Sequence, residues 1–485
     1  MNLTFRLLSL ILVCNLFIFS GCKKSVPPPA PVLPVPTDRQ LAWHEMEQYA
    51  FVHFTTNTFT DKEWGYGDEK EAVFNPTAMD VTQWTKTIKA AGLKGLVLTC
   101  KHHDGFCLWP SKYTEHSVKN SPYKGGKGNV VDEVEKACRV DGLKFGVYLS
   151  PWDRNRADYG SPSYVEYYRN QLKELFEAHK PVFEMWFDGA NGGDGFYGGA
   201  NEKRKIDGKT YYDWPTTLNL VRGMEPNVIF FSDAGPDIRW CGNESGHVNE
   251  TNWNTITADT LYAGKGGIEN LLGTGNENGT SWIPAEVDVS IRPGWFYHAK
   301  EDSLVKTPQQ LFDIYLSSVG RGANLILNIP PDRRGLINEI DATALQGWKK
   351  LIDGYFKTNL ALNKPAKASS FRGNSDDYNA SMVTDGDKET YWATNDEEKS
   401  GNLDIDLGTP KLISFVILQE YIKLGQRVKS FSVEIAKDGK WMAVAKGTTI
   451  GYKRILKIFP TEAQNIRIVI SDSKACPVIS NVEVY

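Results

Sequence analysis

The sequence predicts an α/β fold, a (β/α)8-like TIM barrel followed by an antiparallel β-sandwich. Between residues 42 and 357, apolar strand-like runs alternate with helical patterns, which is typical of βα units around a parallel sheet. From residue 358 onward, short segments of alternating hydrophobicity are separated by turn residues, which is typical of antiparallel strands. The alternative for the first part is a doubly wound open sheet, which the absence of a glycine-rich phosphate loop after the first strand disfavours.

The composition is that of a globular protein with more than one core. The chain has 485 residues, 41% of them hydrophobic, and a net charge of −4, which leaves room for two or three domains. No stripe of Lys and Arg interleaved with aromatics is present, so nucleic acid is not expected as a partner. The 14 Trp and 21 Tyr residues suit sugars, whose faces are apolar and whose edges are polar.

The N-terminus has the three regions of a secretory signal. Arg6 precedes an apolar run over 7–19, and Ser20 and Gly21 lead to Cys22; the run is too short for a dedicated membrane span. Because cysteine follows two small residues, segment 1–22 resembles a bacterial lipoprotein signal, which implies that Cys22 carries the lipid. A plain signal peptide with an incidental cysteine is the alternative.

A proline-rich segment, 23–41, follows the predicted signal. It holds six prolines between residues 27 and 36, so we expect a stiff extended tether between the lipid and the folded body. The expected location is therefore an exported lipoprotein anchored to the outer membrane, on its periplasmic side or at the cell surface. Once Cys14 and Cys22 are set aside, five cysteines without paired spacing remain, and no disulfide scaffold is expected.

The barrel strands are predicted from short runs rich in β-branched and aromatic residues. Capping boxes mark two of the intervening helices, with Asp80 before Gln83 and Ser163 before Glu166, and a further helix is expected over 338–357. Seven strand segments over about 315 residues fit an eight-stranded barrel with long loops. The predicted strands are 50–55, 95–99, 145–150, 182–187, 228–232, 286–291 and 324–329.

The C-terminal part, 358–485, resembles a known type of sandwich. The runs 363–366, 384–392 and 403–408 are similar to discoidin-like, coagulation-factor type C domains. That resemblance implies a loop at Asp385 and Asp387 that commonly holds a structural Ca²⁺ through hard oxygen ligands. A metal-free Asp-Gly turn is the alternative.

Asp188 ends the apolar run 182–187 and is followed by Gly189. In a barrel of parallel strands, the carboxyl end of a strand is where catalytic side chains lie. Taken alone, the pair also suits a turn or a helix cap.

Histidines gather at the ends of the first two predicted strands. His53 ends the first strand, and His102 and His103 follow the second. Three of only eight histidines are therefore expected at the same end of the barrel. Their spacing matches no zinc pattern, and hydrogen bonds to substrate hydroxyls fit better. For each histidine alone, a buried ring satisfied by the backbone is the alternative.

Aromatic residues reach the same end of the barrel. Tyr148, Trp186 and Trp295 lie near the ends of other strands. Each alone is more often a core residue, but several segments delivering an aromatic or a histidine to one end favour a lined pocket.

Two carboxyl groups, one ionised and one protonated near neutral pH, would suit glycoside hydrolysis. Glu244 lies in a glycine-rich loop after the fifth predicted strand, near Trp240, and a dry surrounding would raise its pKa. Glu286 is the competing candidate for the acid and Glu250 a weaker third. Position along the chain does not separate Glu244 from Glu286.

Five separated motifs in one order resemble a known family over essentially the whole barrel. Together they look like the family 29 glycoside hydrolases, the α-L-fucosidases. The resemblance implies a retaining mechanism with Asp188 as nucleophile, a glutamate as acid/base and no catalytic cofactor. The motifs are His53 with 63–65, then 101–106, 186–189, 235–244 and 291–298.

The resemblance also implies the details of the site. The loops at 243–244 and 284–286 are similar to a subfamily that prefers α-1,3 and α-1,4 fucosyl linkages, in which the glutamate of the first loop is the acid/base; this selects Glu244 and leaves Glu286 as the alternative. Fucosylated glycans are the expected partners. A glycan-binding surface lipoprotein with an inactive barrel is the rival function. The predicted substrate-binding residues are His53, Glu63, Trp64, His102, His103, Tyr148, Trp186, Arg239, Arg292 and Trp295.

Overall fold

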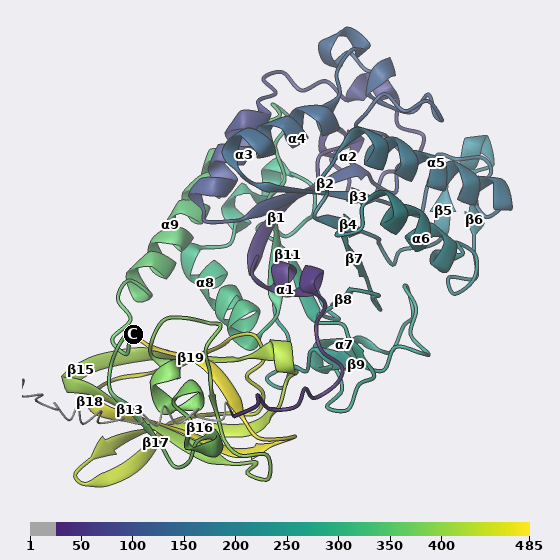
Figure 1. Ribbon diagram of the computed structural model, residues 1–485. Coiled ribbons are helices and arrows are strands. Elements are labelled where there is room, and N and C mark those ends of the chain that lie inside the picture. The colour runs from purple at the N-terminus through teal and green to yellow at the C-terminus, as the bar shows by residue number, and fades with distance from the viewer. Residues whose placement is uncertain (1–25) are drawn as a thin grey trace, which may run out of the picture.

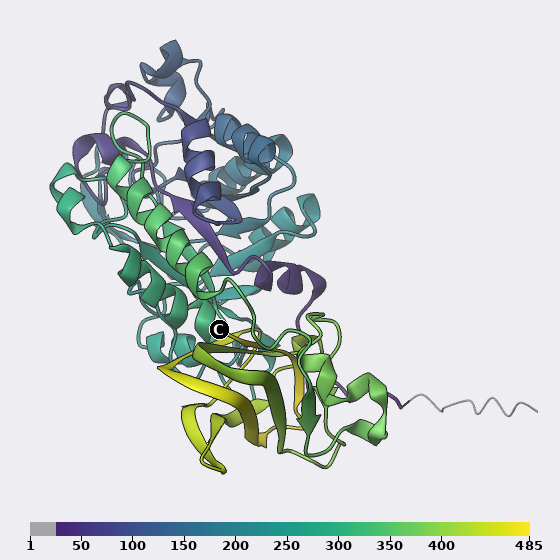
Figure 2. The same ribbon diagram turned by 90° about the vertical axis from the view of Figure 1, so that its left-hand side faces the viewer.

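The computed structural model describes residues 26–485, which form two domains lying against each other (Figures 1 and 2). The predicted signal 1–22 and the predicted lipidation site Cys22 lie outside the described residues. Within 26–485, none of the helices has both the length and the apolar character needed to cross a bilayer. The five cysteines of this part are all buried and free, as expected.

The first domain is a closed barrel of eight parallel strands, which confirms the predicted fold class. Around the barrel the strands follow the order β1-β12-β11-β8-β7-β4-β3-β2, with inward-facing side chains alternating with outward-facing ones along each strand. The strands are β1 (Gln48–Val52), β2 (Gly95–Lys101), β3 (Lys144–Leu149), β4 (Glu184–Trp186), β7 (Ile229–Ser232), β8 (Ile238–Trp240), β11 (Ala285–Ser290) and β12 (Asn324–Asn328).

One barrel strand, β8, was not expected, because residues 238–240 were assigned to a loop. The strand has only three residues, one of them Arg239, and only residues 233–237 separate it from β7 with no helix between them. Neither the length nor the apolar pattern that identifies a strand is therefore present. As a result, Glu244 follows the sixth barrel strand and not the fifth.

Helices cover the outside of the barrel (Figure 1). As expected, Asp80 caps the helix α3, accepting hydrogen bonds from the backbone N–H groups of Thr82 and Gln83. The helix predicted over 338–357 is α9, and Asn338 caps it. The prediction for Ser163 was wrong: the cap of α5 is Ser161, and Pro162 opens the helix where its missing N–H costs nothing. The helices are α1 (Asp38–His44), α2 (Thr56–Thr60), α3 (Val81–Ala90), α4 (Val130–Asp141), α5 (Pro162–Ala178), α6 (Trp214–Met224), α7 (Glu269–Thr274), α8 (Pro308–Ser317) and α9 (Glu339–Tyr355).

The second domain is an antiparallel sheet folded over its own apolar core. The strand order is β14-β19-β15-β18-β16-β17, with β13 added beside β15. Register shifts interrupt the pairing of the long strands β15 and β18, which lets each bend across the domain. The strands are β13 (Ala366–Ala368), β14 (Trp392–Ala393), β15 (Gly401–Glu420), β16 (Val428–Lys437), β17 (Lys440–Gly447), β18 (Arg454–Ser473) and β19 (Val478–Val484). The barrel loops carry two small two-stranded sheets, β5 (Gly193–Gly195) with β6 (Glu202–Arg204) and β9 (Thr255–Ile256) with β10 (Ser281–Trp282).

The two domains share a continuous interface. Phe415 of β15 packs edge-on against Phe312 of α8 and Tyr355 of α9, at ring distances of 6.0 and 5.0 Å. The side-chain amide of Gln426 donates to the carbonyl of Asn252 (3.0 Å) and accepts from the backbone of Asn254 (2.7 Å). Apolar packing and amide pairing together hold the second domain as part of the barrel's own core.

The proline-rich segment is not a free tether where the structure describes it. The backbone N–H of Val32 donates to Leu424 (2.9 Å), and Arg372 and Arg427 donate to the carbonyls of Pro27 and Ala30, both at 2.7 Å. From Asp38 the chain is helical, with Trp43 of α1 buried. The described part of the segment is therefore bound and not a free spacer, because its backbone groups find partners on the second domain and the side chains of Arg39 and Gln40 find partners on the barrel.

The predicted calcium loop closes on itself. Asp385 accepts hydrogen bonds from the backbone of Asp387 (2.8 Å) and from the hydroxyl of Thr390 (2.7 Å), and Asp387 accepts one from the backbone of Glu389 (2.9 Å). Both side chains are exposed. The geometry is that of the alternative, an Asp-Gly turn.

Candidate active site

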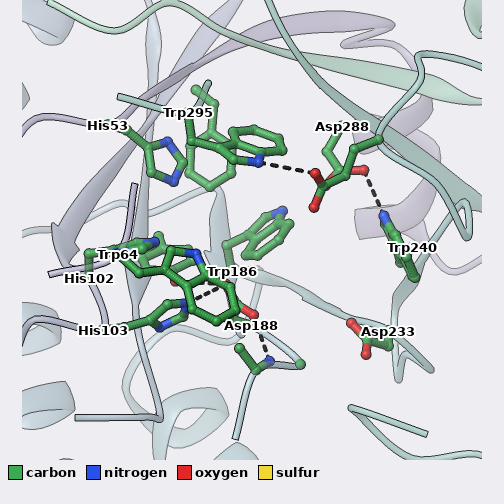
Figure 3. A pocket seen from close by; sticks show the side chains of 15 residues that line it. His53, Trp64, His102, His103, Trp186, Asp188, Asp233, Trp240, Asp288 and Trp295 are labelled. Atoms are coloured by element: carbon green, nitrogen blue, oxygen red, sulfur yellow. Dashed lines mark hydrogen bonds and ion pairs between the residues drawn. The ribbon is translucent and has the colours of Figure 1, made fainter. Parts of the chain in front are cut away.

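A small pocket opens where the barrel strands end (Figure 3). It encloses about 230 Å³, less than the roughly 300–1,000 Å³ typical of pockets for drug-sized ligands, so it suits a single small ring. The lining residues are Phe51, His53, Trp64, His102, His103, Tyr148, Trp186, Asp188, Gly189, Ala190, Asp233, Trp240, Glu244, Asp288 and Trp295. Nine of them had been predicted.

Asp188 lies two residues after the end of β4 and lines the pocket. The hydroxyl of Tyr148 donates to its Oδ2 and the backbone N–H of Ala190 donates to its Oδ1, both at 2.7 Å. His103 Nε2 lies 3.8 Å from Oδ2. Since each oxygen accepts one fixed hydrogen bond, the carboxylate is held in one orientation, with 23% of the side chain exposed for contact with a ligand.

His53 presents a hydrogen-bond acceptor to the pocket. Its Nδ1 lies 2.9 Å from Asn328 Oδ1, and the Asn328 amide nitrogen donates to Ser290 Oγ (2.9 Å) and to the carbonyl of Trp295 (2.8 Å). The amide oxygen is therefore the acceptor, so His53 Nδ1 must carry the proton. Burial lowers the pKa of His53 to about 3, which leaves the ring neutral with a lone pair on Nε2.

His103 and His102 take opposite tautomers. Ser150 gives its proton to the carbonyl of Trp152 (2.6 Å) and therefore accepts from His103 Nδ1 (2.7 Å), so His103 Nε2 is an acceptor. His102 Nδ1 faces the side-chain N–H of Asn57 at 3.5 Å, which places its proton on Nε2. Burial lowers the pKa of both rings, to about 4 for His103. The pocket thus offers one imidazole donor and two imidazole acceptors, a set that matches neighbouring hydroxyls.

Aromatic rings form the apolar side of the pocket. Trp186 stacks on Phe231 at 3.9 Å and lies 5.4 Å from Tyr148. Trp295 lies 5.3 Å from His53, and Trp64, 53% exposed, stands edge-on to His103 at the rim. These aromatic walls fit a sugar-like ring that has one apolar face and one face with hydroxyl groups.

Glu244 reaches the pocket from the loop after β8. The indole N–H of Trp295 donates to its Oε2 at 3.2 Å. The pKa of Glu244 is raised, mainly because the surrounding protein displaces water from the carboxyl group, and further by the negative charges of Asp188 and Glu63. A carboxyl group with a raised pKa can deliver a proton near neutral pH.

The competing glutamates lie elsewhere. Glu286 is fully buried below the pocket, where it accepts hydrogen bonds from the hydroxyl of Tyr49 and from the indole N–H of Trp186; burial raises its pKa to about 7. Because side chains two residues apart share a strand face, Asp288 occupies the pocket layer and Glu286 the layer beneath. Glu250 pairs with Arg321 and Arg454. Of the three candidate glutamates, only Glu244 therefore lines the pocket.

Two arginines predicted to bind substrate are structural. Arg239 is buried and points away from the pocket, since its neighbour Trp240 takes the inward side of β8; it donates to the carbonyls of Leu272 (2.7 Å) and Trp253 (2.9 Å). Arg292 is buried between acidic side chains, 2.9 Å from both Asp302 and Asp341. Both predictions were wrong, because neither guanidinium reaches the pocket.

Glu63 does not line the pocket either, but it positions a residue that does. Its carboxylate accepts hydrogen bonds from the backbone N–H groups of Trp295 (2.7 Å) and Phe296 (3.3 Å), and His298 Nε2 lies 2.6 Å away. Glu63 therefore fixes the loop that carries Trp295.

Two lining carboxyl groups were not predicted. Asp288 is buried and accepts a hydrogen bond from the indole of Trp240 (2.7 Å), and its pKa is raised by burial and then by the charge of Glu244. Asp233 accepts one from the backbone of Gly264 (2.7 Å), and burial raises its pKa to about 6. A signal for each existed, since Asp233 follows β7 as Asp188 follows β4, and Asp288 lies two residues after Glu286. Figure 3 shows both opposite the histidines, on the side of Trp240.

Two family models match the chain, one to each domain. A model described as Alpha-L-fucosidase matches residues 32–354, and one described as F5/8 type C domain matches residues 365–483. Putative alpha-L-fucosidase 1 of Oryza sativa subsp. japonica is 42% identical over 469 residues, covering 96% of this chain and 88% of the relative. Alpha-L-fucosidase 1 of Arabidopsis thaliana is 40% identical, covering 95% and 89%.

Solved structures resemble the chain over both domains. A putative alpha-L-fucosidase from Bacteroides thetaiotaomicron is 40% identical with a TM-score of 0.86, covering 94% of this chain and 99% of that one. A glycoside hydrolase 29 family member from an unknown rumen bacterium is 43% identical with a TM-score of 0.84, covering 94% and 78%. A Ruminococcus gnavus GH29 fucosidase in complex with fucose is 34% identical with a TM-score of 0.85, covering 95% and 96%.

Proposed function

The chain belongs to the alpha-L-fucosidase family, glycoside hydrolase family 29, and we propose that it removes a terminal α-L-fucose from glycans by a retaining double displacement. The observation that carries this proposal is the pocket itself. It sets one carboxylate, Asp188, between two fixed hydrogen-bond donors and lines another wall with Glu244, whose pKa is raised. Retaining glycosidases need such a pair, a nucleophile and an acid.

In the first step, Asp188 attacks the anomeric carbon while Glu244 gives its proton to the glycosidic oxygen. The bond to the leaving sugar breaks, and a β-linked fucosyl ester of Asp188 forms. In the second step, the ionised Glu244 takes a proton from water, the water oxygen attacks the same carbon, and Asp188 leaves. Two inversions return the α configuration. This course calls for carboxyl groups about 5–5.5 Å apart in the complex with substrate.

The histidines and aromatic rings account for the choice of sugar. The two imidazole acceptors, His53 and His103, and the donor His102 offer fixed partners to the ring hydroxyls, and a site built for hydroxyls rejects sugars that lack them. The wall of Trp186 and Trp295 offers an apolar surface to the C5 methyl group of fucose. No cofactor takes part in these steps.

Azide rescue separates the two carboxyl roles. With an aryl α-L-fucoside, Asp188→Ala should lose turnover and, with azide, yield the β-fucosyl azide, because azide takes the place of the nucleophile. Glu244→Ala should yield the α-fucosyl azide, because azide attacks the ester of Asp188. Glu286→Gln is the matched control and should need no azide. The α azide from the Glu286 variant, or none from the Glu244 variant, would overturn the assignment. Binding of fucosylated glycans by the wild type without any turnover, and unchanged binding by Asp188→Ala, would favour the rival function, a glycan-binding protein.

We further propose a preference for α-1,3 and α-1,4 linkages. The support is the similarity of the loops at 243–244 and 284–286 to enzymes with that preference. The test compares kcat/KM for fucose release from Lewis-type trisaccharides and from an α-1,2-linked trisaccharide. Faster release from the α-1,2 substrate would contradict the proposal.

The proposed location is that of an exported lipoprotein, anchored through Cys22 to the outer membrane and acting on fucosylated glycans in the periplasm or at the cell surface. The support is the pattern of residues 1–22. Labelled palmitate should enter the wild type and not a Cys22→Ala variant, and the variant should move from the membrane to the soluble fraction. Equal labelling of both would overturn the proposal.

The structural Ca²⁺ on the loop of Asp385 and Asp387 stays a prediction. Calorimetric titration with Ca²⁺ tests it, with Asp387→Asn as the variant that should lose the heat of binding. If the wild type gives no heat of binding, the loop holds no Ca²⁺ and is stabilised by its own hydrogen bonds alone.

A further inference from the structure

Three ligating side chains meet away from the pocket, where the end of α5 approaches α4. Asp132 and Glu135 stand one helical turn apart on α4, and His179 directly follows the last residue of α5. One ligand atom from each lies within 4.8 Å of the other two. In residues 26–485, no other group of three such side chains comes this close together.

His179 distinguishes this cluster from an ordinary acidic surface. The residue is only 3% exposed, and its Nδ1 is buried without a hydrogen-bond partner. The oxygen facing it, Glu135 Oε2, is 3.7 Å away, beyond hydrogen-bond distance. A buried nitrogen without a hydrogen-bond partner destabilises the folded state unless another group binds to it.

Each of the two carboxylates forms an ion pair with a basic side chain. Arg139 pairs with Oε1 of Glu135, which leaves Oε2 facing His179. Lys136 lies 2.7 Å from Oδ2 of Asp132, one turn along the helix. An outer partner such as Arg139 orients a carboxylate that binds a metal, whereas Lys136 occupies an oxygen of Asp132 that the ion would take. Around one tetrahedral zinc ion, neighbouring ligand atoms stand about 3.3–3.4 Å apart, a spacing that the 3.7 Å gap reaches with a small shift.

We propose that Asp132, Glu135 and His179 bind one Zn²⁺ ion, with water as the fourth ligand. One imidazole nitrogen with two carboxylate oxygens suits zinc, whereas Ca²⁺ and Mg²⁺ take all-oxygen sets. The ion joins the end of α5 to the middle of α4, so its role is structural. It contacts none of the residues that line the active-site pocket.

Calorimetric titration of ZnCl₂ into metal-free protein without a histidine tag tests the site. We expect one equivalent to bind the wild type, with little heat from CaCl₂ or MgCl₂, and a rise in Tm because only the folded state holds the ligand set. Fucosidase activity should be the same with and without the ion. His179→Gln and Asp132→Asn should each abolish the stoichiometric binding.

Two controls match the variants. His116 is buried and lies 2.7 Å from Glu71, a histidine–carboxylate pair without a third ligand, so His116→Gln should keep the binding. His103→Gln should keep it too, which excludes the pocket histidines as the ligands. Asp132 is partly exposed, so its variant is expected to fold even where His179→Gln does not.

Lys136 supplies a test in the opposite direction. Its exposed ammonium group competes with the ion for Asp132, so Lys136→Gln should tighten Zn²⁺ binding by about two- to fivefold, the range expected for one exposed ion pair. Full binding in the Asp132 and His179 variants, or no binding by the wild type, would overturn the proposal.

Discussion

At the scale of single residues, the pocket distinguishes its carboxyl groups by what surrounds each of them. Asp188 accepts hydrogen bonds from Tyr148 and from the backbone of Ala190. Glu244 has a single indole donor, and its pKa is raised. Asp288 is buried against Trp240 beside it. The three carboxyl groups therefore have three different environments. That of Asp188 suits a nucleophile, that of Glu244 suits an acid, and that of Asp288 suits neither role.

Tyr148→Phe tests the support of the nucleophile. The change removes one hydrogen bond to Asp188 and keeps the ring, so kcat should fall roughly 10- to 100-fold, the equivalent of a hydrogen bond to a charged group. Steady-state kinetics with an aryl fucoside measures this, and Tm should shift by only a few degrees. An unchanged kcat would show that the hydroxyl does not hold Asp188 during the reaction.

Trp295→Phe tests the source of the Glu244 pKa. The indole hydrogen bond favours the charged form of Glu244, so its loss should raise the pKa of this carboxyl further. The acid must be protonated to act, and activity falls as the pH rises through its pKa. The alkaline limb of kcat against pH should therefore move to higher pH in the variant. Movement to lower pH would contradict the assignment of Glu244 as the acid.

At the scale of elements, the loop after β11 depends on close contact with the loop after β1. A Cβ atom added at Gly294 would lie 2.4 Å from Glu63 Oε1, so only glycine lets the Glu63 carboxylate reach the backbone of Trp295. Glu63 was expected to touch substrate, and its effect on the pocket is instead transmitted through this loop.

Gly294→Ala should therefore damage the pocket and leave the fold intact. Displacement of Glu63 releases Trp295, and a shift of about 1 Å in a positioning residue can reduce kcat/KM by roughly 100-fold. Gly266→Ala is the matched control, since nothing lies within 4 Å of its added Cβ. Steady-state kinetics measures the damage to the pocket, and circular dichroism checks that both variants are folded. Equal kcat/KM values for the two variants would show that the contact between Gly294 and Glu63 is dispensable.

Element prediction succeeded where the pattern was long and failed where it was short. Seven barrel strands, the cap at Asp80 and the helix over 338–357 carry clear periodicity or capping chemistry. The strand β8 does not, since its three residues include a buried Arg239 whose partners come from loops far along the chain. Local sequence cannot show which side chains a distant loop will satisfy.

At the scale of the whole molecule, the second domain completes the core of the first. Phe415 fills a gap between α8 and α9, and the ion pair of Lys453 with Glu47 joins β18 to the segment before β1. The described proline-rich segment runs along the second domain. The second domain therefore stabilises the barrel.

Phe415→Ala should weaken the molecule without changing its chemistry. Truncation of a buried phenylalanine costs about 3–5 kcal/mol, so Tm should fall clearly, while kcat/KM at 25 °C stays that of the wild type. Phe459→Ala, at an exposed position of β18 (88% exposed), is the matched control and should change neither. Thermal melts and kinetics give both readouts, and an unchanged Tm for Phe415→Ala would mean that the interface contributes little.

The sequence by itself determined the barrel and sandwich, the position of Asp188 and the three histidines, and the aromatic character of the pocket. Periodicity, strand ends and residue chemistry are local properties, so they can be read along the chain. Only the tertiary structure placed Glu244 in the pocket and Glu286 beneath it, put Arg239 and Arg292 outside the pocket, and added Asp233 and Asp288 to its lining. Those outcomes depend on which layer of the barrel a side chain reaches and which distant groups satisfy it, and both are set by packing between elements far apart in the chain.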